Sequence, residues 1–100
     1  MLKYRCTKFE ALMSRLVVAE HAFKHGLNEE SIRYVWENRM ASQHRKAPYE
    51  DQVVAIGLTE DGRVVELIGS QKPSAVVIYH AMEPPTKRVL FELGLLARRR

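Results

Sequence analysis

The sequence contains little cysteine and no long apolar run. Cys6 is the one cysteine among 100 residues, so no disulfide can form within the chain, and a reducing cytoplasm is the expected setting. No apolar stretch reaches the roughly 18 residues that cross a membrane. The N-terminal residues also lack the apolar core of a signal peptide. We therefore expect a cytoplasmic protein that is neither exported nor embedded in a membrane.

Several catalytic signatures are missing as well. The chain has no Walker loop, no glycine-rich dinucleotide fingerprint and no CxxC pair, which argues against nucleotide-driven and redox enzymes. His21 and His25 have the spacing of two metal ligands on one helical face, but no third ligand is evident. We therefore expect no metal and no cofactor.

The composition fits one globular domain over residues 1–100. Hydrophobic residues make up 46% and charged residues 28%, which is too apolar for a disordered chain. A net charge of +4 favours a polyanionic partner such as nucleic acid. Three of the positive charges belong to Arg98, Arg99 and Arg100, which equally fit a solvated tail.

The first half of the chain has helical periodicity. Apolar residues at steps of three and four predict an amphipathic helix over residues 8–25, which Gly26 ends. Asn28 is the expected cap of a second helix over residues 29–39. Residues 42–47 fit a polar edge strand that Pro48 interrupts.

The second half has the pattern of strands. Runs of β-branched residues predict an antiparallel meander over residues 52–59, 63–70 and 75–81. Regular alternation would place Val76, Ile78 and His80 on one face of the last strand.

The order of these elements predicts the fold class. Pro84 and Pro85 suit the start of a C-terminal helix, because proline costs nothing in the first turn. We therefore expect an α+β fold in which two N-terminal helices pack on a three- to four-stranded antiparallel sheet, followed by a C-terminal helix.

Three segments, FKHGLNEESIRYVWEN, VVAIGLTEDGRVVEL and VIYHAMEPPTKR, together resemble the BrnT-like group of bacterial toxins, which have a RelE-type fold. The resemblance covers roughly residues 20–90. Its motifs are Lys24-His25-Gly26, Ala55-Ile56-Gly57 and Asp61-Gly62-Arg63. Where that group commonly has Ser-Ala-Arg after the last strand, this chain has His80-Ala81-Met82, so Lys87 and Arg88 are the nearest basic substitutes.

The resemblance implies the toxin of a type II toxin–antitoxin system. Such a toxin is a cytoplasmic endoribonuclease that works without metal or cofactor and is inhibited by a cognate antitoxin protein. The expected partners are therefore RNA and the antitoxin, and a homodimer and a toxin–antitoxin heterotetramer are both open.

Metal-free RNA cleavage through the 2′-hydroxyl needs a base, an acid and cations that stabilise the phosphorane charge. We expect His80 to serve as acid or base, with His25 assisting and Lys87 and Arg88 supplying charge. Glu66 is a further candidate for proton transfer. The candidates for contacting the substrate, by gripping phosphate or stacking on bases, are Arg45, Lys46, Arg63, Tyr49 and Tyr79.

These residues also have structural explanations. His80 could be a partly buried histidine with a hydrogen-bonded ring, and His25 could complement a helix dipole. The charges at residues 44–46 could protect an edge strand from aggregation. The alternative function is a non-catalytic interaction module of the same fold that binds an acidic protein partner or nucleic acid, and a plain structural subunit is a third.

Overall fold

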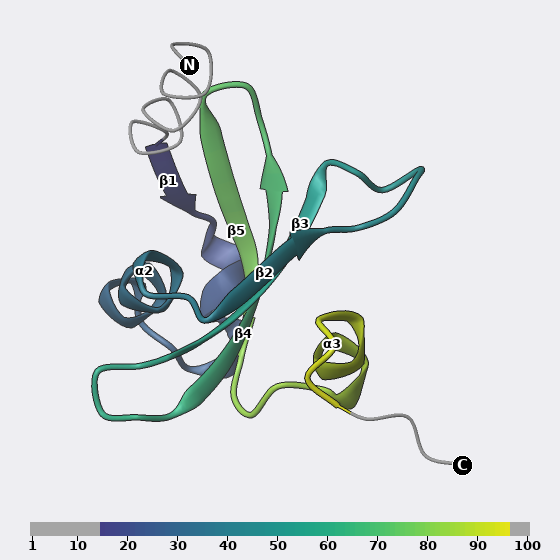
Figure 1. The fold of residues 1–100 in the computed structure, drawn as a ribbon. Coiled ribbons are helices and arrows are strands. Elements are labelled where there is room, and N and C mark those ends of the chain that lie inside the picture. The colour runs from purple at the N-terminus through teal and green to yellow at the C-terminus, as the bar shows by residue number, and fades with distance from the viewer. Residues whose placement is uncertain (1–14, 97–100) are drawn as a thin grey trace, which may run out of the picture.

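A five-stranded mixed β-sheet organises the chain (Figure 1). The computed structural model describes residues 15–96, and its strands lie in the order β1-β5-β4-β3-β2. The strands are β1 (Arg15–Val18), β2 (Ala41–His44), β3 (Gln52–Leu58), β4 (Val64–Gln71) and β5 (Ala75–Met82). The helices are the 3-10 helix η1 (Glu20–His25), α2 (Glu29–Glu37) and α3 (Lys87–Glu92). The pairing of β1 with β5 is parallel, and the other three pairings are antiparallel.

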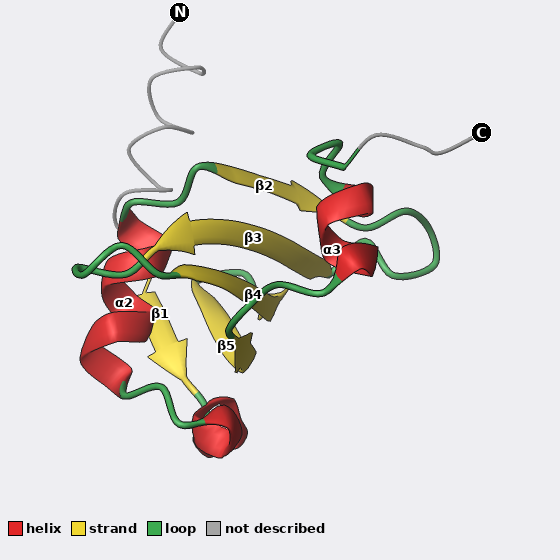
Figure 2. Cartoon of the chain, turned by 90° about the horizontal axis from the view of Figure 1, so that it is seen from below, coloured by secondary structure: helices red, strands yellow, loops and turns green. Residues whose placement is uncertain are grey.

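Helices cover both faces of the sheet (Figure 2). On one face, η1 and α2 pack on alternate residues of β3, β4 and β5, and the cluster comprises Ala22, Leu27, Ile32, Val35, Val53, Ala55, Val65, Leu67, Val76, Ile78 and Ala81. On the other face, Val89 of α3 packs on Val54 and Ile56 of β3. Residues 53–57 are consecutively buried, as expected for a strand that is covered on both sides.

The predicted meander and the second helix are confirmed. The turn between β3 and β4 contains Gly62 with a φ of 87°, a conformation that glycine adopts without steric cost. The side chain of Asn28 accepts a hydrogen bond of 2.7 Å from the backbone N–H of Ser31, which caps α2. The predicted polar edge strand is present as β2, although it is shorter than expected and begins one residue earlier.

The predicted RelE-like arrangement, two N-terminal helices on a three- to four-stranded antiparallel sheet, is wrong. Residues 15–18 of the predicted first helix form β1, which pairs in parallel with β5 from Arg15↔Ala75 to Val18↔Ile78. Only the six residues of η1 remain helical, and residues 8–14 lie outside the described residues. The apolar run at residues 16–18 suits a strand as well as a helix, and pairing with β5 satisfies the backbone groups of both segments.

A register shift in β5 also overturns the predicted face of His80. Gly69 pairs with Ile78, but Ile68 pairs with His80, so Tyr79 is an extra residue in β5. Paired residues of neighbouring strands share a face. His80 therefore lies on the α3 side of the sheet with Ile68, whereas Ile78 belongs to the core beneath η1 and α2.

None of the helices in the described part of the chain has the length and apolarity needed to cross a membrane.

Gly57 allows α2 to approach β3 closely, and this contact gives a test of the fold. A Cβ atom at Gly57 would lie 2.9 Å from the backbone oxygen of Val35 and 3.2 Å from the Cα of Arg39. Gly57→Ala should therefore lower the free energy of unfolding by about 1–3 kcal/mol, as overpacking of a core does. Urea denaturation followed by circular dichroism measures the change. An unchanged midpoint would contradict the close approach of α2 to the sheet.

Candidate functional site

A buried carboxylate connects β4, β5 and the start of α3. Glu66 of β4 is 2% exposed. Its Oε1 accepts hydrogen bonds from the backbone N–H and the hydroxyl of Thr86, at 2.7 and 2.9 Å, and its Oε2 lies 2.7 Å from Nε2 of His80. Because a carboxylate only accepts, we assign the proton of this last bond to Nε2. Both oxygens are therefore satisfied, as burial of a charged group requires.

Thr86 also caps α3. Its hydroxyl oxygen accepts a hydrogen bond of 3.3 Å from the backbone N–H of Val89 while the same hydroxyl donates to Glu66. Val89 is 2% exposed and packs against the sheet. The carboxylate of Glu66 thus determines where the first turn of α3 lies on the sheet.

His25 and His80 form a ring contact. Their ring centroids lie 5.8 Å apart at an interplanar angle of 74°, an edge-to-face arrangement. The side chain of His80 is 27% exposed, and His25 is exposed at the end of η1. With the proton assigned to Nε2 of His80, the other ring nitrogen, Nδ1, is a hydrogen-bond acceptor. The two histidines predicted as catalytic are therefore brought together.

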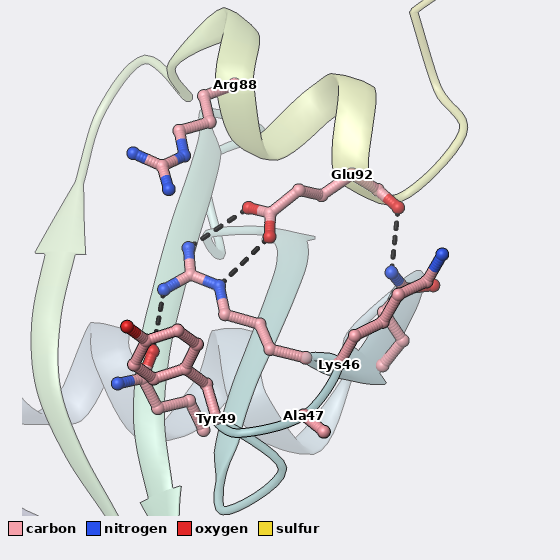
Figure 3. A pocket seen from close by; sticks show the side chains of 8 residues that line it. Lys46, Ala47, Tyr49, Arg88 and Glu92 are labelled. Atoms are coloured by element: carbon pink, nitrogen blue, oxygen red, sulfur yellow. Dashed lines mark hydrogen bonds and ion pairs between the residues drawn. The ribbon is translucent and has the colours of Figure 1, made fainter.

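A pocket of about 630 Å³ lies between α3 and the loop that joins β2 to β3 (Figure 3). Arg88 and Glu92 line it from α3, and the loop contributes Lys46, Ala47 and Tyr49. Its remaining lining residues are Gln43, Arg45 and Gln52. Four of the residues predicted at the active site, Arg45, Lys46, Tyr49 and Arg88, thus share one concave surface.

The pairing of Arg45 with Glu92 holds the pocket together. The guanidinium donates to both carboxylate oxygens of Glu92 at 3.0 Å and to the side-chain oxygen of Gln52 at 2.7 Å. The hydrogen bonds to Glu92 raise the pKa of Arg45 above its ordinary value, although burial opposes this shift. Gln43 adds a hydrogen bond of 2.8 Å to the backbone oxygen of Glu92. The end of α3 is therefore fixed to β2 and to the start of β3.

The side chains of Lys46 and Arg88 have no hydrogen bond or ion pair within residues 15–96. Both side chains are exposed, and no dashed line meets Arg88 in Figure 3. Tyr49, beside Lys46 in the same loop, is 56% exposed. The pocket therefore offers two free cations and an accessible aromatic ring.

Other predicted site residues lie elsewhere. Arg63 forms ion pairs with Asp61 at 3.1 Å and Glu83 at 2.8 Å, and the bond to Asp61 is the main reason that its pKa is raised. Lys87 is exposed in the first turn of α3 and does not line the pocket. Tyr79 does not line the pocket either.

Thr86 and Glu92 were not predicted as site residues. Thr86 follows two prolines and directly precedes a helix. Threonine is a usual N-cap residue at such a position, so a local signal was present. Glu92 gives no such signal, because its role depends on an arginine 47 positions away in the chain.

Comparison with known families, with curated proteins and with solved structures found no match. Within the described residues, no group of three or more His, Cys, Asp or Glu side chains is arranged to hold a metal ion.

The hydrogen bonds of Glu66 can be tested by Glu66→Gln. Glutamine keeps the shape but is neutral, and its NH₂ group cannot accept from Thr86, although it can donate to Nε2 of His80 in the other tautomer. The free energy of unfolding should fall by about 1–3 kcal/mol, because hydrogen bonds to a charged group contribute more than neutral ones. Glu60→Gln, at an exposed glutamate, is the control and should change stability by less than about 0.5 kcal/mol. Equal stability of the two variants would contradict the assigned hydrogen bonds.

Proposed function

We propose that this protein is a metal-independent endoribonuclease in which His80 and His25 transfer protons. The observation that supports the proposal is the contact between the two imidazole rings, one of which is held by a buried carboxylate. Histidine exchanges protons near neutral pH, so a pair of histidines can supply both a base and an acid. A ring separation of 5.8 Å lets both side chains reach one phosphodiester group.

In this mechanism His80 is the base. Its Nδ1 accepts the proton of the 2′-hydroxyl as that oxygen attacks the adjacent phosphorus. Glu66, on the opposite side of the ring, stabilises the imidazolium that forms and fixes the ring orientation. His25 gives a proton to the departing 5′-oxygen. The products are a 2′,3′-cyclic phosphate and a 5′-hydroxyl.

We assign the start of α3 as the source of positive charge for this reaction. Thr86 bonds to the same carboxylate as His80, and Lys87 and Arg88 follow it directly. In the proposed reaction Lys87 offsets the charge of the phosphorane, while Arg88 lines the pocket beside α3. Their positions result from the cap of α3.

The resemblance to BrnT-like toxins supports a biological role for this activity. We propose that the chain is the toxin of a type II toxin–antitoxin pair that acts in the cytoplasm and is inhibited by a cognate antitoxin. The support comes from the three sequence segments around His25, Gly57 and His80.

A non-catalytic interaction module is the second candidate. It is favoured by the two free cations of the pocket, which suit RNA or an acidic protein partner, and by the absence of the arginine that is common in the BrnT-like group. Such a module would retain RNA without shortening it.

Digestion of RNA in EDTA distinguishes the two candidates. The enzyme should produce fragments ending in 2′,3′-cyclic phosphate, which mass spectrometry identifies. His80→Gln and His25→Gln should each slow cleavage by roughly 100-fold or more, the usual contribution of a general acid or base. His21→Gln removes an exposed histidine from the same helix η1 and should leave the rate unchanged.

Two results would contradict the proposal. Intact RNA after incubation with the folded protein would exclude cleavage and favour the binding module. If cleavage were as fast in His80→Gln as in His21→Gln, another residue would have to carry the proton. Expression in bacteria provides an independent readout, because the His80 variant should inhibit growth less than the parent.

A further inference from the structure

We propose that the pocket between α3 and the β2–β3 loop binds one nucleotide of a single-stranded RNA. Lys46 and Arg88 would each contact a backbone phosphate, one on either side of this nucleotide, and the ring of Tyr49 would stack on its base. This inference rests on the proposed action on RNA, but it concerns binding alone and can be tested without cleavage.

The pocket has an excess of positive charge. Three cationic side chains and one carboxylate line it, and the carboxylate of Glu92 is taken up by Arg45. Two positive charges therefore lack a partner within the described residues. Lys46 and Arg88 line the same pocket from different segments of the chain, and in Figure 3 their side chains extend on either side of Glu92. Successive phosphates of one strand can therefore each contact one of them.

The volume of the pocket and the exposed ring of Tyr49 point to a nucleotide as the ligand. A volume of about 630 Å³ is within the range of sites for small organic ligands and exceeds what a single phosphate ion needs. Tyr49 is 56% exposed, although aromatic side chains are usually largely buried. Proteins that bind single-stranded nucleic acid combine such a ring with cations that follow the backbone.

The protein holds the two walls of the pocket in place before any ligand binds. The backbone N–H of Tyr49 donates to the oxygen of Lys46, and the N–H of Gln52 donates to the oxygen of Tyr49, both at 2.9 Å. The opposite wall is fixed by the hydrogen bonds of Glu92 to Arg45 and Gln43. Rigid support of this kind lowers the ordering cost of binding.

The pocket and the histidine pair are linked through α3. Glu66 bonds to both His80 and Thr86, and Arg88 lies two residues beyond Thr86 in the same helix. A strand that reaches the histidines can therefore place another of its nucleotides in the pocket. A free nucleotide offers the same phosphate and base, so the experiment includes both ligands.

The test measures fluorescence anisotropy of a labelled 2′-O-methyl RNA oligonucleotide. This probe lacks the attacking hydroxyl and cannot be cleaved. Lys46→Gln/Arg88→Gln should weaken binding by roughly 20-fold at 0.1 M salt, because two phosphate contacts are lost. The slope of log K against log salt should become shallower by about 1.4. Tyr49→Ala should weaken binding by about 5- to 150-fold, whereas Tyr49→Phe should retain most of the affinity.

Arg15→Gln/Arg33→Gln is the matched control. It removes the same charge from β1, at the opposite edge of the sheet from β2, and from α2, on the other face. We expect it to change affinity by less than about threefold, as distant screened charges do. The inference is overturned if the pocket variant binds like this control, or if the wild-type protein does not bind the probe.

The outcomes separate this inference from the proposed nuclease. If binding depends on the pocket residues but ordinary RNA stays intact, the proposed nucleotide site is supported and the proposed nuclease activity is contradicted. If RNA is cleaved but substitutions of Lys46, Arg88 and Tyr49 leave the affinity unchanged, the proposed nuclease activity is supported and the proposed nucleotide site is contradicted. Competition by a nucleoside monophosphate at micromolar concentration would identify a free nucleotide as the ligand. Competition only by the oligonucleotide would identify the strand.

Discussion

The hydrogen bonds of the Glu66 carboxylate are the interaction on which the α3 side of the protein depends. Burying a charged group is unfavourable unless its hydrogen bonds are satisfied, and here Thr86 and His80 satisfy both oxygens. The same bonds set the ring of His80 and the first turn of α3. One side chain of β4 therefore helps to position both His80 and the α3 wall of the cationic pocket.

Helices pack on both faces of the sheet, but the two faces differ in how much apolar contact they make. The larger core lies beneath η1 and α2, while α3 makes only a small apolar contact around Val89. Polar contacts supply the rest of the attachment of α3, through Thr86 at its start and Glu92 at its end. A helix attached in this way leaves space beside it, and the pocket occupies that space.

Local chemistry predicted local structure well. The cap at Asn28, the glycine turn at Gly62 and the three strand runs depend on neighbouring residues, and all appear in the structure. The parallel strand β1 was not predictable in this way, because its partner β5 lies at the other end of the chain. The extra residue Tyr79 was missed too, since regular alternation contains no signal for a bulge.

The candidate site was predicted in part. Arg45, Lys46 and Tyr49 are near one another in sequence, so their common surface follows from a single loop. The arrival of Arg88 and Glu92 from α3 depends on tertiary contacts that no local pattern encodes. His25 and His80 were named for their chemistry, and the fold supplies their ring contact.

Amide hydrogen exchange, measured by NMR, tests the central role of Glu66 most directly. We predict that the amides of Thr86, Val89 and Leu90, which donate hydrogen bonds at the start of α3, exchange slowly in the wild type and much faster in Glu66→Ala, while those of α2 keep their protection. Unchanged exchange in α3, or equal loss of protection in α2 and α3, would contradict the claim that Glu66 positions this helix.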